Sequence, residues 1–256
     1  MIAKRIIPCL DVKDGRTVKG TRFVHLQDMG DPVAMAAFYA AEGADELVLL
    51  DISAGDEGRH AFTDIVHRVA RELDIPFTVG GGISCVADVQ QLLKAGADKV
   101  SVNSAAVRNP LLIRDLAYQF GSQCVVLAID SKQEADGQWY VYTHGAKLAT
   151  GMRSSEWAAR AVDLGVGELL LTCINNDGLR QGFALAHTAT VSRSLGVPVI
   201  ASGGAGKAQH FRDVFRDGSA DAALAAGIFH SRELRIPDLK KYLQTENITV
   251  RPYESF

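Results

Sequence analysis

An eightfold alternation of short apolar runs and longer amphipathic segments constrains this chain more than any other feature of its sequence. The runs are rich in Ile, Val and Leu and lie at 5–11, 46–51, 76–80, 99–103, 123–130, 168–173, 198–202 and 221–225. Helical periodicity marks the stretches 32–42, 62–73, 86–95, 110–118, 154–164, 185–195, 208–216 and 237–243. Near-continuous apolar runs are typical of parallel strands covered by helices, so the pattern predicts eight consecutive βα units.

The two halves of the chain also resemble each other. Similar motifs begin at Glu46 and Glu168, and again at Ile75 and Val197, with the same offset of 122 residues each time. GAD at 96–98 corresponds to GSAD at 218–221 in the same order. An internal repeat of this kind constrains a fold strongly. We therefore predict a (β/α)8 TIM barrel with a twofold internal half-barrel repeat, formed by one domain of residues 1–256.

Composition excludes several classes of partner. The chain has 27 basic and 30 acidic residues, so no basic field indicates a nucleic acid or a membrane surface. No stretch approaches the roughly 20 apolar residues that a membrane span needs. The cysteines are far apart and lack metal-ligand spacing, which predicts reduced thiols packed as small apolar groups in a cytoplasmic protein: Cys9, Cys85, Cys124 and Cys173. We expect neither a metal nor a cofactor.

Two carboxylates occupy corresponding places in the repeat. Asp11 and Asp130 end the first and fifth predicted strands, and barrel active sites lie where strands end and βα loops begin. Carboxyl groups whose environments separate their pKa values can supply a proton donor and a proton acceptor near neutral pH. The structural alternative is that each carboxylate caps a helix or pairs with a cation such as Lys13 or Lys19.

Glycine clusters follow the third and seventh predicted strands, at 80–82 and 203–204. Without a Cβ, their backbone N–H groups can approach a phosphate closely. Asn103–Ser104 and 225–227 end the neighbouring strands, so each half can form a phosphate site from two adjacent loops. One such cluster alone is weak evidence, because a tight turn would also explain it. Two at matching positions predict a long substrate with two phosphates.

Further polar residues are expected at the same mouth of the barrel. The sixth strand ends at Thr172, and the loop beyond it carries Asp177, which either orients the substrate or forms a simple Asp-Gly turn. The segment 14–31 is long for a βα loop and contains Lys19. It is either a mobile lid that brings an ammonium group onto the substrate or an idle loop.

Charged residues also begin several strands, at the opposite end of the barrel: Arg5, Glu46, Lys99 and Glu168. Two cations and two carboxylates there can neutralise one another, since isolated burial of any one would be costly. They form either a salt-bridged floor or a gate between the barrel interior and a protein docked beneath.

Over essentially its whole length, the sequence resembles the cyclase subunit of imidazole glycerol phosphate synthase. The resemblance rests on AKRIIPCLDV at 3–12, VKG at 18–20, GADEL at 43–47, VGGGI at 79–83, GADKV at 96–100, GSQC at 121–124 and ASGGAG at 201–206. It implies that ammonia from a docked glutaminase subunit converts phosphoribulosyl-formimino aminoimidazole carboxamide ribonucleotide into imidazole glycerol phosphate and aminoimidazole carboxamide ribotide.

The resemblance also implies a role for each candidate residue. Asp11 and Asp130 would be the acid–base pair, and Lys19 would lie in the closing loop. One phosphate would be held by Gly82, Asn103 and Ser104, and the other by Gly204, Ala226 and Gly227. Ammonia would enter from a glutaminase on the N-terminal face, through a gate of Arg5, Glu46, Lys99 and Glu168.

The chain departs from the common family pattern at Asn175 and Asn176, where many members carry Asp-Arg, and at Gly227, where a hydroxyl side chain is frequent. Three other functions remain open. The sister barrel that isomerises the preceding intermediate has the same two phosphates, although it needs no charged gate. A paralogue that forms amidines on a surface sugar would keep the ammonia route. A non-catalytic activator of a glutaminase would need neither aspartate.

Overall fold

Eight parallel strands form the framework of the protein. The computed structural model describes residues 2–21, 24–53 and 58–253. Hydrogen-bonded neighbours follow the order β1, β4, β5, β6, β7, β10, β11, β12, with β12 also next to β1, which confirms the predicted (β/α)8 barrel fold class. The strands are β1 (Arg5–Lys13), β4 (Leu47–Asp51), β5 (Phe77–Gly80), β6 (Lys99–Val102), β7 (Val125–Gln133), β10 (Glu168–Cys173), β11 (Val199–Ser202) and β12 (Ala222–Ala225).

A long helix follows each of the eight strands, close to the predicted bounds: α1 (Pro32–Ala41), α2 (Gly58–Glu72), α3 (Val86–Lys94), α5 (Leu111–Phe120), α6 (Ser154–Asp163), α7 (Leu185–Ser194), α8 (Ala208–Arg216) and α10 (Ile236–Thr245). Two short helices, α4 (Ser104–Arg108) and α9 (Gly227–His230), come directly after β6 and β12. They were not predicted, and they occupy equivalent positions in the repeat. Ser104 and Gly227 are therefore the first residues of matching short helices.

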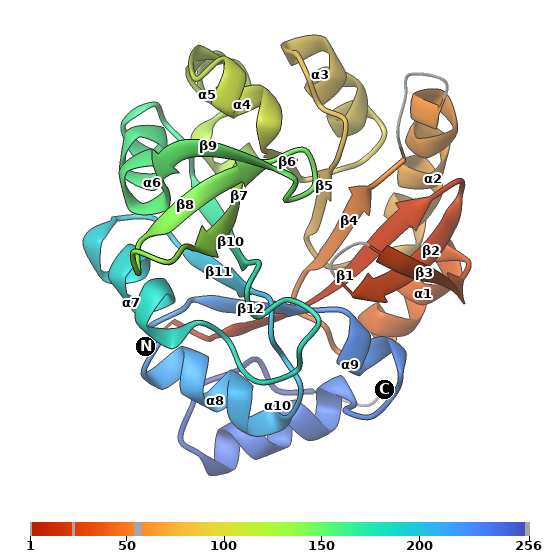
Figure 1. Cartoon of the computed structure of the whole chain (residues 1–256). Coiled ribbons are helices and arrows are strands. Elements are labelled where there is room, and N and C mark those ends of the chain that lie inside the picture. The colour runs from red at the N-terminus through yellow and green to blue at the C-terminus, as the bar shows by residue number, and fades with distance from the viewer. Residues whose placement is uncertain (1, 22–23, 54–57, 254–256) are drawn as a thin grey trace. The chain divides into compact units, whose positions relative to one another are not determined.

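Two antiparallel hairpins extend the sheet and correct the prediction for the loops. The segment 14–31, expected to be an irregular lid or loop, contains β2 (Arg16–Thr21) and β3 (Val24–Gly30), and β2 pairs with the end of β1. Residues 22–23 of that segment lie outside the described part. In the same way, β8 (Trp139–Thr143) pairs with the end of β7, and β9 (Leu148–Arg153) pairs with β8. Figure 1 shows β8 and β9, in green, beside β7.

Each hairpin begins on a strand that carries a candidate aspartate. Strand β1 continues two residues past Asp11, which lies opposite Val18 of β2. Strand β7 continues three residues past Asp130, which lies opposite Tyr142 of β8. The prediction that both aspartates lie at strand tips is therefore wrong. Each lies inside its strand, where it pairs in parallel with a barrel strand and antiparallel with the hairpin.

Aspartates of the repeated GAD-type motifs have a structural role. Asp45 Oδ2 accepts the backbone N–H of Ile6 at 2.8 Å. Asp98 Oδ2 accepts that of Phe77 at 2.9 Å, and Asp221 Oδ2 accepts that of Val199 at 3.0 Å. In each case the aspartate precedes one strand and binds the N–H of a residue at the start of the neighbouring strand. Charge-assisted bonds of this kind fix where the strands begin.

The chain divides into two compact units, residues 1–101 with 225–256, and residues 102–224. We call them the first and second units. Each has its own fully buried side chains, such as Phe77 in the first unit and Trp157 in the second. All four cysteines are free, although Cys85 is exposed and so does not pack as predicted. The single domain expected for residues 1–256 stays a prediction. No helix in the described ranges has the length and apolar character of a membrane span.

Candidate active site

Asp130 is the carboxylate of the second unit, and its surroundings change its acidity. Burial raises the pKa of Asp130 to about 6; the Asn103 amide, which donates to Oδ2 at 3.0 Å, opposes the rise, and the nearby charge of Asp177 adds to it. Asn103 ends in a buried Oδ1 that has no hydrogen-bond partner. A buried acceptor of this kind is costly to leave unpaired, so it suits a donor group on a bound molecule.

Thr172 lies beside Asp130. The two residues are register partners in the parallel pair β7–β10, so their side chains point to the same face of the sheet. Ser202 is the next partner of Thr172, on β11. The structure thus brings Asp130, Thr172 and Asn103 together, with Asp177 near enough to influence the Asp130 pKa.

Gly203 and Gly204 let the loop after β11 pack against the loop after β10. Gly204 has a φ of +108°, and a Cβ there would lie 2.0 Å from the carbonyl oxygen of Gly182. The backbone N–H of Gly182 donates to the Gly204 oxygen at 2.8 Å. Gly203 has a φ of +91°, and its Cβ would lie 3.5 Å from that of Asp177. Only glycine fits both constraints at position 204.

Two asparagines hold the same loop in place. Asn176 Nδ2 donates to the Gly182 oxygen at 2.8 Å. Asn175 Oδ1 accepts the backbone N–H of Gln133 at 2.8 Å, and its Nδ2 donates to the Gln133 oxygen at 3.2 Å. These positions differ from the common family pattern, yet their short amides bind backbone groups on both sides of the loop. Asp177 directly follows the two asparagines in sequence, and its Cβ lies close to Gly203.

Ser104 follows Asn103 and begins α4. Its Oγ accepts the backbone N–H of His144, from the turn between β8 and β9, at 3.2 Å. A hydroxyl that accepts one bond still has its own hydrogen to donate. Ser104 therefore keeps a donor for a further partner.

In the first unit, Asp11 lies on β1 beside Leu50 of β4, and the Cys9 thiol contacts its Oδ1 at 3.8 Å. Gly81 and Gly82 follow β5 with φ values of +94° and +62°. A Cβ on Gly81 would lie 2.0 Å from the carbonyl oxygen of Asp51, so this turn requires glycine. Gly82 lines a pocket of about 120 Å³ that Asp51 also borders.

Lys19 reaches the short helix α9. A Cβ on Gly227 would lie 3.2 Å from Lys19 Cε, so the absence of a side chain at 227 lets the lysine approach. Burial lowers the pKa of His230 to about 4, with Lys19 lowering it further and the Cys9 backbone opposing the shift. Thus Lys19 and Gly227 are brought together, and Ala226 precedes Gly227 as the N-cap of α9.

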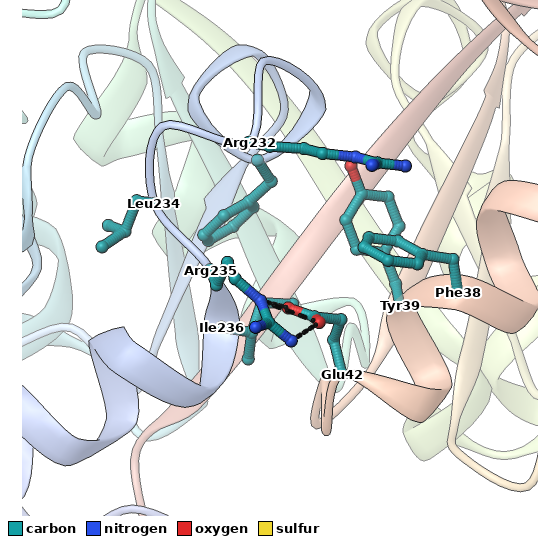
Figure 2. Close-up of a pocket in the computed structure, with 8 residues that line it drawn as sticks. Phe38, Tyr39, Glu42, Arg232, Leu234, Arg235 and Ile236 are labelled. Carbon is teal, nitrogen blue, oxygen red and sulfur yellow. Dashed lines mark hydrogen bonds and ion pairs between the residues drawn. The ribbon is translucent and has the colours of Figure 1, made fainter.

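Tyr39 and His230 connect α9 to an outer pocket of about 350 Å³. The Tyr39 hydroxyl lies 2.6 Å from His230 Nδ1. Figure 2 shows Arg235 paired with Glu42 in this pocket, while the Arg232 guanidinium lies 5.2 Å from the centre of the Phe38 ring. Sequence reasoning missed the Tyr39–His230 contact, because the two residues are 191 positions apart.

Three of the four predicted gate residues form one cluster. Glu46 is 1% exposed and accepts from Arg5 Nη1 at 2.8 Å and from Lys99 Nζ at 2.8 Å and 2.9 Å. Thr78 Oγ1 donates to Glu46 at 2.6 Å. The buried carboxylate of Glu46 thus binds two cations. Glu168 begins β10, in the second unit, and is buried.

A second histidine cluster was also missed. His187 of α7 stacks on Trp139 with a centroid separation of 4.2 Å, and its Nε2 lies 3.0 Å from Ser131 Oγ and 3.3 Å from Ser154 Oγ. It ties the start of β8 to the helices. The aromatic and β-branched run 139–143 was the available signal for this strand. Across the described residues, no three His, Cys, Asp or Glu side chains are grouped to hold a metal ion.

Comparison with known proteins identifies close relatives. The sequence profile of the histidine biosynthesis protein family matches residues 5–235. A protein of Flavobacterium johnsoniae is 56% identical over 251 residues, which span 98% of this chain and 100% of that protein. A protein of Geobacillus kaustophilus is 57% identical over 252 residues, which also span 98% of this chain and 100% of that protein. Both are named imidazole glycerol phosphate synthase subunit HisF.

Proposed function

We propose that this chain, which belongs to the histidine biosynthesis protein family and within it to the cyclase subunits of imidazole glycerol phosphate synthase, uses Asp11 and Asp130 as its acid–base pair. The substrate is phosphoribulosyl-formimino aminoimidazole carboxamide ribonucleotide, which ammonia converts into imidazole glycerol phosphate and aminoimidazole carboxamide ribotide. The chain itself is an enzyme of histidine biosynthesis and one subunit of a two-subunit synthase.

The observation that carries the acid–base assignment is the raised pKa of Asp130, at about 6. About a tenth of such groups are protonated at pH 7, so Asp130 can give and take a proton near neutrality. We assign Asp130 as the proton donor when the formimino C–N bond breaks. Asp11 then acts as the base that moves protons when ammonia adds to the ribulosyl carbonyl.

The surroundings of Asp130 support this division of work. The unpaired Oδ1 of Asn103 offers an acceptor to a substrate N–H or O–H next to the carboxyl. Thr172 offers a hydroxyl on the same face. Asp177, through its negative charge, favours the protonated form of Asp130.

The two phosphates are assigned to Gly82, Asn103 and Ser104, and to Gly204, Ala226 and Gly227. Strained glycine turns support both sites, because a Cβ would block the close backbone approach that phosphate binding uses. Lys19 supports the second site, since its ammonium end lies next to Gly227 and can meet a phosphate there.

The partner is a glutaminase subunit, docked on the face where β1, β4, β6 and β10 begin. Arg5, Glu46, Lys99 and Glu168 serve as the ammonia gate. The two cations, Arg5 and Lys99, that bind the buried Glu46 support a gate that admits neutral ammonia and repels ammonium. An isomerase would need neither this cluster nor a nitrogen source.

Turnover of the bisphosphate substrate by the purified chain with an ammonium salt at alkaline pH tests the proposal, with absorbance as the readout. We expect ammonia-dependent turnover that falls at least about a hundredfold in Asp11→Asn and in Asp130→Asn. The matched control is Asp136→Asn, an exposed carboxylate in the turn before β8. Near-wild-type turnover in both site variants overturns the acid–base assignment, and rearrangement without ammonia would indicate the isomerase.

A further inference from the structure

The turn between β8 and β9 has an unusual backbone. His144, Gly145 and Ala146 have φ values of +55°, +63° and +65°, three consecutive residues in the left-handed region. The N–H of Lys147 closes the turn on the Thr143 oxygen at 3.0 Å. A non-glycine residue in this region brings its Cβ too close to the following carbonyl oxygen. Such strain persists when surrounding structure holds it, and it concentrates at binding sites.

A simpler turn would join the two strands. Thr143 pairs with Leu148, so four residues, 144–147, connect them. A two-residue turn is the commonest connection between paired antiparallel strands and needs no such strain at histidine or alanine if its residues are Asn-Gly. The sheet alone therefore does not explain the longer turn.

The longer turn contacts Ser104. The backbone N–H of His144 donates to Ser104 Oγ, 40 residues earlier in the chain, at 3.2 Å. Within the turn, His144 Nδ1 lies 3.0 Å from the Thr143 hydroxyl, and Thr143 is buried. These contacts hold His144 in place, so that its backbone N–H faces Ser104.

The charge of the turn matches an anion. Residues 144–147 are His-Gly-Ala-Lys, with a cation and no carboxylate. Both Lys147 and His144 are exposed, so neither is committed to a buried ion pair. The turn that contacts Ser104 thus carries a positive charge and no negative one.

We propose that the 144–147 turn is a further phosphate-binding element, in which the His144 N–H and the Ser104 hydroxyl together hold one substrate phosphate. The inference rests on the phosphate site assigned to Ser104 above. When the phosphate arrives, the His144 N–H transfers from Ser104 Oγ to a phosphate oxygen, and the Ser104 hydroxyl donates to another oxygen of the same group. The strained turn holds the N–H in place beforehand, which reduces the entropy lost on binding.

The first test uses the wild-type chain. Labelled with ¹⁵N, it is titrated with inorganic phosphate, and we expect the His144 amide resonance to shift with the same saturation curve as that of Ser104. In Ser104→Ala the shift at His144 should require several-fold more phosphate. A His144 amide that stays unchanged while Ser104 responds would overturn the proposal, because the N–H would then not contact the anion.

The second test replaces residues 144–147 by Asn-Gly, which keeps the Thr143–Leu148 register. The KM for the bisphosphate should rise about tenfold, as the loss of one hydrogen bond to a charged group implies, while kcat changes less than about twofold. The control is Asp136→Ala, in the turn at the other end of β8, which should keep the wild-type KM. Thermal unfolding checks that the shortened chain is folded.

A double-variant cycle separates this proposal from the function it rests on. If the turn and Ser104 hold one phosphate, the shortened turn combined with Ser104→Ala should raise KM by less than the product of the two single effects. Wild-type turnover with an unchanged KM in the shortened variant refutes the proposed role of the turn and leaves the proposed function in place. A wild-type chain without ammonia-dependent turnover refutes the proposed function, while the phosphate titration still tests the turn.

Discussion

The side-chain amide of Asn103 donates to Asp130 Oδ2 at 3.0 Å, across 27 positions of sequence. This bond opposes the burial that raises the Asp130 pKa to about 6. Asn103 therefore sets how readily the carboxyl releases its proton, in addition to the phosphate contact assigned to it.

Replacing Asn103 by alanine should raise the Asp130 pKa further, because a hydrogen bond that stabilises the charged form is lost. With Asp130 as proton donor, the falling alkaline limb of the kcat/KM profile should move upward by about one pH unit. The measurement is ammonia-dependent turnover across pH. Asn109→Ala, at the exposed C-cap of α4, should leave the limb in place. An unmoved limb in Asn103→Ala would mean that another group sets it.

Gly81→Ala should destabilise the protein by about 3 kcal/mol or more, because the new Cβ meets the Asp51 oxygen at 2.0 Å in addition to a positive φ. Gly137 provides the control, since it has a φ of +76° with no atom within 4 Å of its Cβ position. Gly137→Ala should cost about 1 kcal/mol. Denaturant unfolding compares the two variants. Equal losses of unfolding free energy would contradict the prediction, because backbone strain alone would then account for both.

Stability should depend on His187 in acid. Burial lowers its pKa from 6.5 to about 4, so the unfolded chain takes up a proton at His187 before the folded chain does. The contribution of neutral His187 to the free energy of unfolding is complete above pH 6.5. It is lost as the pH falls toward 4, by about 3 kcal/mol in total. In His187→Gln, unfolding free energy should fall less over this range. His67→Gln, on the exposed face of α2, should keep the wild-type slope.

Glu46→Gln should destabilise the first unit by about 3 kcal/mol, because Arg5 and Lys99 would lose the carboxylate that both of them bind. Glu134→Gln, which removes the partner of Lys132 in a half-exposed pair, should cost much less. Urea unfolding measures both. The same variants test the gate, since Glu46→Gln should lower glutamine-driven turnover more than turnover with added ammonium.

Sequence pattern was sufficient for the parallel strands, because a strand covered by helices has a continuous apolar run, as β10 and β11 do. It was insufficient for the hairpins. Strand β9 is mostly exposed and contains Gly151 with a positive φ, so it has no continuous apolar run to detect. The segment 14–31 was treated as a loop for the same reason.

The candidate residues were easier to identify than their contacts. Asp130 ends an apolar run of the sequence and Ser104 follows one, and that position alone selects them. The Asn103–Asp130 bond and the His144–Ser104 bond depend on how distant segments meet. Likewise, the approach of Lys19 to Gly227 follows from a hairpin that was not predicted. Spacing identifies the residues, while packing determines which of them touch.

The two hairpins that continue β1 and β7 also bear on how such enzymes diversify. In each case the aspartate is also held by parallel pairing with a neighbouring barrel strand, so the length and composition of the hairpin can change beyond the aspartate without moving it. Insertions, deletions and cassette exchange between relatives are tolerated there at little cost to folding. New substrate preferences can therefore be grafted onto an unaltered proton-transfer apparatus.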